Sequence, residues 1–356
     1  MKRTALILTT RQIYPPNGGD KLRILSIINS LKKDYIIDLA VIGFEKIDKK
    51  FDIQINFKNK RKIKFYKPAL SNFIIKFLKF NSVPLQSLIY FDQRIQKMIH
   101  KDFDFKYDLL QIHLLRLSQY SKKINSKNKI LDLTDSLILS YNRAKRYRSL
   151  NILMRLLYLF ELKRIYKFKK QELKSFNLLT FVSNYDKKFF EKIFPKFKKK
   201  TQLIENSSNI NKIKGNLFSI KSKKILYIGN FRSISNLISV FYVSNLINNF
   251  NKNHRKKIKL ILVGNLDLKL KIYLFFNNKI KHCTWTRLKN NKYIASICAT
   301  KIGSGFQNKI TDYLNLKIPV LTNSYSYYGL NSRLKKKVKK FNNQQEFNLN
   351  LKNIIK

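Results

Sequence analysis

Short, mainly apolar runs recur along the chain, separated by stretches in which apolar residues return every three or four positions. The runs are Thr4–Thr10, Tyr35–Phe44, Lys62–Tyr66, Asp108–Leu115, Lys129–Asp135, Leu178–Ser183, Lys224–Gly229, Lys259–Gly264 and Ile318–Thr322. Runs of this kind are typical of parallel strands buried on both faces. A helix is expected after the first run, because Leu22, Leu25, Ile28 and Leu31 share one helical face. The pattern therefore predicts an α/β fold.

The strand–helix alternation begins again in the second half of the chain. Lys224–Gly229 and Lys259–Gly264 end in glycine and flank a helix predicted at Asn236–Phe250. The length of 356 residues suggests two domains. We expect a Rossmann-like N-terminal domain at 1–206 and a Rossmann-like C-terminal domain at 223–356, facing each other across a cleft.

The charge is strongly positive, with Lys+Arg 74 against Asp+Glu 20 and a formal net charge of +54. Such an excess is typical of proteins that bind nucleic acid or anionic lipid. The lysines are spread along the whole chain, however, and Ile, Asn, Phe and Tyr are abundant while Gly and Pro are scarce. This composition favours the codon bias of an AT-rich genome, and we expect no nucleic-acid partner.

Two predicted helices are rich in basic and apolar residues, namely Ser71–Phe80 and Leu150–Phe176. The second is apolar as far as Leu162 and then basic, which predicts a core helix that emerges into solvent. Peripheral contact of either helix with an anionic membrane is the alternative. We find no stretch suited to a bilayer span or a signal peptide, and Cys283 and Cys298 fit a reducing compartment, so we expect a cytoplasmic protein or one at the inner membrane surface.

The stretch Ala299–Asn323 predicts a strand, a Gly303-Ser304-Gly305 turn, a helix that begins at about Phe306, and a second strand. Glycines allow the backbone of such a turn to approach a ligand, and the helix directs unpaired N–H groups at it. A phosphate fits there. Lys309 and Asp312 are three residues apart and share a helix face, so one can meet the phosphate while the other binds a sugar hydroxyl.

Three further candidate positions follow predicted strands of the first half. Gly18-Gly19 forms a turn that opens a helix, although such glycines also serve packing alone. His113 and Asp135 lie at the ends of two later strands, and ligands of open parallel sheets bind at that edge. We expect His113 to contact a sugar, and Asp135 to orient an acceptor hydroxyl or to act as its base.

The residue pattern of Ala299–Asn323 resembles the donor-binding segment of nucleotide-sugar glycosyltransferases with the GT-B fold. The pattern is G-x-G-x-x-x-K-x-x-[E/D] followed by x-P-V-[L/V]-x-[T/N]. The resemblance implies a diphosphate site at Gly303, Ser304, Gly305, Gln307, Asn308 and Lys309, and a ribose site at Asp312. The first loop, P-x-x-G-G with an arginine one turn later, implies that Gly18, Gly19 and Arg23 approach the diphosphate and acceptor. Arg232 is a further candidate for the diphosphate. Many family members have Glu at the positions of Ser304 and Asp312.

The resemblance implies transfer of a sugar from a nucleotide-diphosphate sugar to a polysaccharide, lipopolysaccharide or lipid-linked acceptor. The sequence has neither a G-x-G-x-x-G fingerprint, nor a D-x-D pair at a strand end, nor a His/Cys cluster, so we expect no cofactor and no metal. Backbone N–H groups, helix dipoles and basic side chains would then stabilise the leaving diphosphate. The alternatives are a non-catalytic GT-B binding protein and a basic nucleic-acid or membrane-binding module. Trp285 either stacks on the nucleobase or fills the core.

Overall fold

The computed structural model of the chain describes residues 2–15, 18–45, 60–69, 82–104, 106–206, 214–277 and 279–356. The helix predicted at Ser71–Phe80 lies outside these residues. Contacts divide the chain into a first unit, Met1–Ile138 with Ile152–Ile210, and a second unit, Leu139–Asn151 with Asn211–Lys356. The domain limits of 1–206 and 223–356, and the cleft between the domains, stay predictions.

The first unit is built on a seven-stranded sheet with the order β3-β2-β1-β4-β5-β6-β7, and all its described pairings are parallel. Its elements are β1 (Arg3–Thr9), α1 (Gly19–Leu31), β2 (Tyr35–Ile42), β3 (Lys60–Tyr66), α4 (Leu85–Tyr90), α5 (Gln93–Asp102), β4 (Tyr107–His113), η1 (Leu115–Lys123), β5 (Ser126–Thr134), α7 (Ile152–Glu172), η2 (Leu173–Ser175), β6 (Leu178–Phe181), α8 (Asn184–Ile193), η3 (Pro195–Lys200) and β7 (Thr201–Leu203). Between β5 and α7, α6 (Leu137–Arg146) begins in the first unit and ends in the second. The strand order reverses between β1 and β4, where ligands of such sheets bind.

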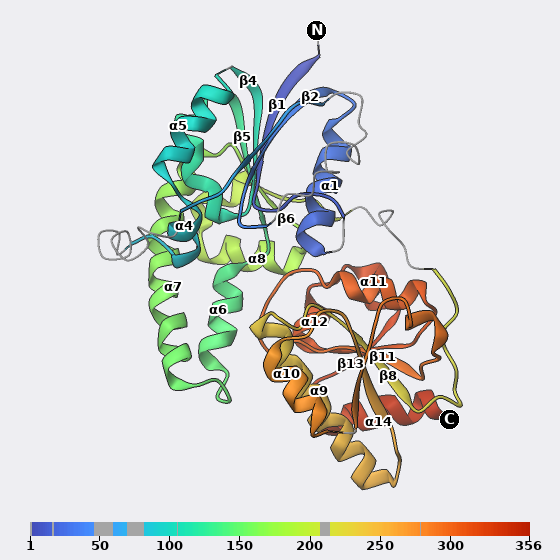
Figure 1. Ribbon diagram of the computed structural model, residues 1–356. Helices are drawn as coiled ribbons and strands as arrows, with labels where there is room; N and C mark the ends of the chain where they lie inside the picture. Colours follow the sequence, from blue (N-terminus) through green and yellow to red (C-terminus); the bar gives the residue numbers. More distant parts are fainter. Residues whose placement is uncertain are drawn as a thin grey trace. The chain divides into compact units, whose positions relative to one another are not determined.

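Both faces of this sheet are covered, as the uninterrupted apolar runs predict. Leu6 and Leu8 of β1 join a core that includes Phe168 of α7, whereas Ile7 packs with Ile24 of α1 in a separate core. Figure 1 shows the same arrangement, with α1 on one side of the strands and α4, α5 and α7 on the other. Successive side chains of a strand point to opposite faces, so each face of β1 receives its own apolar set.

The second unit is built on a six-stranded sheet with the order β10-β9-β8-β11-β12-β13, again parallel in all its described pairings. Its elements after α6 are β8 (Lys224–Ile228), α9 (Ile234–His254), β9 (Lys259–Val263), α10 (Leu268–Phe275), β10 (Ile280–Cys283), η4 (Leu288–Asn290), β11 (Ala295–Cys298), α11 (Asn308–Asn315), β12 (Val320–Asn323), α12 (Ser324–Tyr328), α13 (Ser332–Lys335), β13 (Val338–Phe341) and α14 (Gln344–Ile355). The core on one face includes residues of α9, α10 and α14, and the core on the other includes residues of α11. The predicted α/β class with two parallel sheets is confirmed.

Helix α7 differs from its prediction. Its apolar N-terminal half is exposed, with Leu153 at 70% and Phe160 at 59%, whereas Leu162, Phe168 and even Lys169 are buried. The predicted burial of the apolar half is therefore wrong, whereas Lys163, Lys167 and Lys170 of the basic half are exposed, as predicted. The physical reason is position, because Figure 1 shows the N-terminal end of α7 running beyond the strands, which only its later turns contact. Within the described ranges, no helix is both long and apolar enough to cross a bilayer.

Candidate functional site

In the second sheet, the neighbouring strands β8 and β9 are each followed by a glycine. Gly229 follows β8, and Gly264 follows β9 with φ +135. A Cβ on Gly264 would lie 2.0 Å from the carbonyl oxygen of Gly229, so only glycine fits there. The two strand ends consequently lie backbone to backbone at the carboxyl edge of the sheet.

The turn predicted after β11 is present, and both of its glycines have left-handed backbone conformations. Gly303 has φ +116 and Gly305 has φ +80. The helix after the turn, α11, begins at Asn308, two residues later than predicted, and its N-cap residue, Gln307, makes no side-chain capping bond. No side chain of the N-cap residue therefore occupies the start of α11, which suits an anion site. The strand order of this sheet reverses between β8 and β11, so the turn lies at the switch point.

Lys309 in the first turn of α11 extends toward the end of β8. Its Nζ lies 3.2 Å from Oδ1 of Asn236 and 4.8 Å from the ring centroid of Tyr227. A Cβ on Gly229 would lie 3.4 Å from the same Nζ. Burial lowers the pKa of Lys309, although Cys298 and Asp312 act in the opposite direction. The switch point therefore carries an ammonium group that a neutral asparagine holds in place.

Asp312 lies one turn further along α11 and is partly buried. Its carboxylate has no hydrogen-bond or ion-pair partner among the residues that the structure describes, Lys309 included. Burial raises the pKa of Asp312 to about 6, an effect that Lys309 partly offsets. A partly buried carboxylate without a partner is costly, which is expected where a ligand supplies the partner.

The other predicted site residues of the second unit differ in their hydrogen bonds and in their exposure. The Ser304 hydroxyl lies 2.7 Å from that of Ser140, and Gln307 Nε2 donates to the Ser304 carbonyl at 3.4 Å. Asn308 is the partly buried first residue of α11. Arg232 is exposed. Trp285 is 48% exposed, so it does not fill the core.

Arg143, which the sequence analysis did not single out, holds the glycine turn from within the same unit. Its Nη1 donates to the carbonyl of Gly303, and its guanidinium lies 4.2 Å from the ring centroid of Tyr325. One carbonyl of the turn is thereby satisfied by a cation. No motif marked Arg143, because it lies in α6, more than a hundred residues before the turn.

In the first unit, Gly18 and Gly19 open α1 at the switch point between β1 and β4. Gly18 is the N-cap residue, with an extended φ of −177 and no side-chain capping bond, and Gly19 is the first helical residue. A Cβ on Gly18 would have nothing within 4 Å. The helix start is thus open, and contact of these glycines with a diphosphate stays a prediction.

Arg23 is 1% exposed and forms a two-pronged ion pair with Asp132 of β5. Nε and Nη2 donate to the carboxylate at 3.1 and 2.7 Å, and Nη1 donates to the carbonyl of Ile204 at 2.7 Å. The structure thus places Arg23 in the interior of the first unit. Its predicted contact with a donor stays a prediction.

Asp132 also binds His113, the last residue of β4. Nδ1 of His113 lies 2.9 Å from the Asp132 carboxylate, and Nε2 is buried with no hydrogen-bond partner within the described part of the chain. Burial tends to raise the pKa of Asp132, but its bond to His113 and the Arg23 charge outweigh burial and hold this pKa well below its usual range. The ionised carboxylate therefore accepts the Nδ1–H of His113 and orients the ring.

Asp135 directly follows β5 and lines a cavity of about 200 Å³ together with Lys169 and Asp20. Burial raises the pKa of Asp135 to about 7, and Asp186 and Asp20 add to the effect. A carboxyl group that titrates near neutral pH suits a general base. Lys169 was missed from the sequence because it is one of many lysines in a basic stretch.

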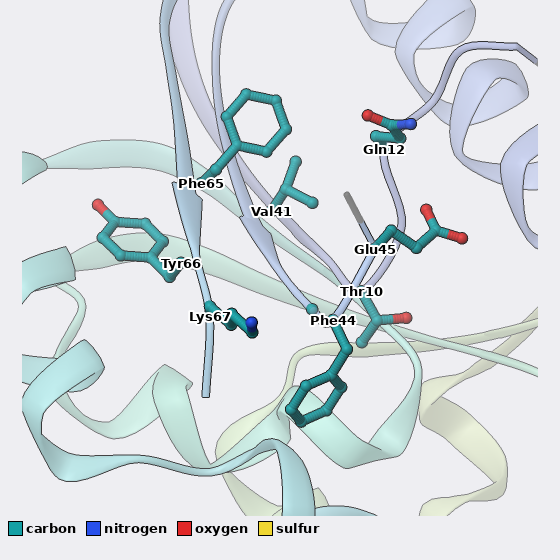
Figure 2. A pocket seen from close by; sticks show the side chains of 9 residues that line it. Thr10, Gln12, Val41, Phe44, Glu45, Phe65, Tyr66 and Lys67 are labelled. Carbon is teal, nitrogen blue, oxygen red and sulfur yellow. The ribbon is translucent and has the colours of Figure 1, made fainter. Parts of the chain in front are cut away.

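A second cavity of about 270 Å³ lies at the ends of β1, β2 and β3. Figure 2 shows the Phe65 ring at the upper end of the view and the Phe44 ring at its lower end, with Gln12 and Glu45 to the right. Glu45 is paired with Arg11 at 2.8 Å. None of the predicted site residues lines this cavity.

Comparisons with known proteins agree with this architecture. No protein-family model and no curated protein matches the sequence. Solved structures match over nearly the whole chain at low identity. The structure of Anabaena Alr3699/HepE in complex with UDP-glucose has a TM-score of 0.61 and 12% identity, with 99% of this chain and 90% of that one covered.

Two further solved structures cover the whole of this chain. The lipopolysaccharide outer core galactosyltransferase WaaB has a TM-score of 0.55 and 11% identity, with 90% of its own chain covered. A UDP-forming α,α-trehalose-phosphate synthase from Burkholderia xenovorans has a TM-score of 0.59 and 10% identity, with 91% covered. At these identities the likeness establishes the fold of this chain.

Proposed function

We propose that this chain, which has the GT-B fold, is a metal-independent glycosyltransferase. It moves a sugar from a nucleotide-diphosphate sugar to a polysaccharide, lipopolysaccharide or lipid-linked acceptor. One observation carries the proposal: Lys309 lies at the switch point of a parallel sheet, and the carboxylate of Asp312, one turn later, has no partner among the described residues. A cation and a carboxylate so spaced suit a diphosphate and a ribose, and related folds such as HepE bind UDP-glucose.

The donor diphosphate lies at the start of α11 in this proposal. The helix start, which lacks a side-chain cap from Gln307, and the positive end of the helix dipole favour an anion there, and Lys309 adds a full charge. Gly303, Ser304 and Gly305 allow close approach of the backbone. Ser304, Gln307, Asn308 and Arg232 supply polar groups around this position. Asp312 accepts hydrogen bonds from both hydroxyls of the ribose.

Transfer forms a bond between an acceptor oxygen and the anomeric carbon of the sugar. The bond from that carbon to the diphosphate breaks, and its electron pair leaves with the nucleotide diphosphate. The acceptor hydroxyl loses its proton, which we assign to Asp135, since its pKa of about 7 lets the carboxylate take up a proton near neutral pH. We assign Nε2 of His113 to a sugar contact, because it is a buried ring nitrogen without a hydrogen-bond partner among the described residues.

Calorimetric titration of the full chain with UDP, GDP and their sugars tests the donor site. Loss of a charged hydrogen bond costs about 1.5–3 kcal/mol, so Asp312→Asn and Lys309→Met should each weaken binding by roughly ten- to a hundredfold. Lys271→Met, at an exposed position of α10, is the matched control and should bind as the wild type does.

Unchanged affinity in both site variants, or no nucleotide binding by the wild type, would contradict the proposal. Tight nucleotide binding without measurable sugar transfer would favour the non-catalytic GT-B binding protein.

A further inference from the structure

Helix α7 buries three charged side chains on the face that packs against the first sheet. Glu161, Lys169 and Glu172 are each 4% exposed or less. Glu161 accepts a hydrogen bond from the backbone N–H of Leu85 at 2.8 Å, and Glu172 pairs with Lys122 at 2.7 Å. Both carboxylates are thus compensated, as buried charges normally are.

Lys169 is the exception among the three. Its Nζ is buried and has no hydrogen-bond partner within the described residues. Its Nζ lies over the Phe190 ring, 5.3 Å from the ring centroid. An aromatic face compensates an ammonium only in part. The N–H groups of the Lys169 ammonium are therefore available to donate hydrogen bonds to a ligand.

This unused donor faces a cavity with ionisable groups from three other segments. The charged residues that line the cavity of about 200 Å³ are Lys169, Arg116 of η1, Asp135 after β5 and Asp20 in the first turn of α1. The Asp135 carboxylate has no hydrogen-bond partner in the described part of the chain either. Four separate segments of the chain thus place ionisable groups at one cavity beside the switch point between β1 and β4.

The charges around the cavity are mixed, which is unusual in a chain with 74 Lys+Arg and only 20 Asp+Glu. Asp20 and Asp135 line it, and Asp186 acts on both Asp135 and Lys169 from close by. Burial lowers the pKa of Lys169 to about 8, against the pull of these carboxylates. A phosphate or carboxylate entering the cavity would meet Asp20 and Asp135 as well as the cations Lys169 and Arg116, so its charge would be repelled as well as attracted. A hydroxyl group can bind to the cations and to the carboxylates alike, because it both accepts and donates hydrogen bonds.

We propose that this cavity binds one uncharged, hydroxyl-bearing sugar ring of the acceptor, with Lys169 donating to its oxygens and Asp20 and Asp135 accepting from its hydroxyls. The inference rests on the proposed function and deepens it, because it names a neutral sugar, and not a phosphate- or carboxylate-bearing ring, as the receiving group. The volume agrees, since about 200 Å³ holds roughly seven waters at about 30 Å³ each, the room of a single ring.

Saturation-transfer NMR with methyl glycosides tests the inference on the full chain. The probes are the methyl glycosides of glucose, galactose, mannose and N-acetylglucosamine, each beside its 6-phosphate or uronic acid counterpart where one exists. We expect at least one neutral glycoside to bind, and the charged counterparts to bind more weakly. In Lys169→Met the affinity should fall about tenfold or more, because a charged donor is lost.

Lys170→Met is the matched control, because Lys170 is exposed on the same helix, and it should leave binding unchanged. The melting temperature of Lys169→Met should equal or exceed that of the wild type, since an uncompensated buried charge is removed. A purely structural lysine would show the opposite. Asp20→Asn, at a partly exposed helix start, gives an independent variant if Lys169→Met does not fold, and it should also weaken glycoside binding.

The inference is overturned if no neutral glycoside binds, if Lys169→Met and Asp20→Asn bind as the wild type does, or if the charged probes bind better. UDP and GDP titrated into the same samples separate the two proposals. Nucleotide binding without glycoside binding refutes the cavity assignment alone, whereas loss of both refutes the proposed function as well.

Discussion

Asp132 shows how much one buried side chain organises in the first unit. Besides Arg23 and His113, it accepts hydrogen bonds from the hydroxyls of Thr134 at 3.0 Å and Thr180 at 2.6 Å. Four side chains from α1, β4, β5 and β6 thus converge on one carboxylate. Such a network fixes the relative positions of the strands and the orientation of the His113 ring.

We expect Asp132→Asn to lower the free energy of unfolding by about 3–5 kcal/mol at neutral pH, because it leaves Arg23 buried without its counter-charge. The folded-state pKa of Asp132 lies below its unfolded value of about 3.9, so its stabilisation is present above about pH 4 and is lost as pH falls further. Urea unfolding at pH 7 and at pH 3 measures both effects, and the difference between wild type and variant should shrink at pH 3.

Asp34→Asn, at an exposed position, is the control and should change stability by less than about 0.5 kcal/mol. A loss below about 1 kcal/mol in Asp132→Asn, or a difference that is the same at both pH values, would show that the carboxylate charge does not hold this network.

At the scale of elements, strand ends decide where Lys309 and Asp312 lie. The sequence predicted the strands, the glycine turn and α11, but the helix begins at Asn308 because Gly305 is left-handed and Gln307 keeps an extended conformation. Lys309 therefore falls in the first turn, where it reaches over Gly229. The close approach of the Gly264 backbone to that of Gly229 fixes the position of the strand end over which Lys309 lies.

We predict that Gly264→Ala lowers the free energy of unfolding by more than about 1 kcal/mol, because alanine disfavours φ +135 and its Cβ would clash with the carbonyl of Gly229. Nucleotide affinity should fall as well, since Gly229 borders Lys309. Gly215→Ala is the control, because its Cβ would meet only a side-chain carbon of Leu316 at 3.8 Å. Equal melting temperatures and nucleotide affinities for the two variants would rule out this account of the strand ends.

For the whole molecule, the net charge of +54 is the dominant electrostatic property. If the lysines cover all faces, as their even spread along the chain predicts, their mutual repulsion destabilises the folded state over long distances. The screening length falls from about 10 Å at 0.1 M salt to about 3 Å at 1 M, so salt relieves this repulsion.

We expect the melting temperature to rise by several degrees between 0.05 and 0.5 M sodium chloride at pH 7. The rise should shrink at about pH 10.5, where half of the lysines lose their charge. Scanning calorimetry of the full chain checks both statements. A melting temperature that is insensitive to salt at pH 7 would show that the excess charge is compensated locally.

The sequence by itself determined the class of fold, the tandem parallel sheets and the glycine turn that precedes Lys309 and Asp312. These features are local, because an apolar run, a glycine pair or an apolar helix face can be recognised within one short stretch of sequence. Only the tertiary structure decided which polar side chains meet. Arg23 and Asp132 are 109 residues apart, and Lys169 lines the same cavity as Asp135, from a helix whose apolar half was expected to be buried. Such partners depend on the strand order and on how far each helix extends past its sheet, and no local pattern of residues records either.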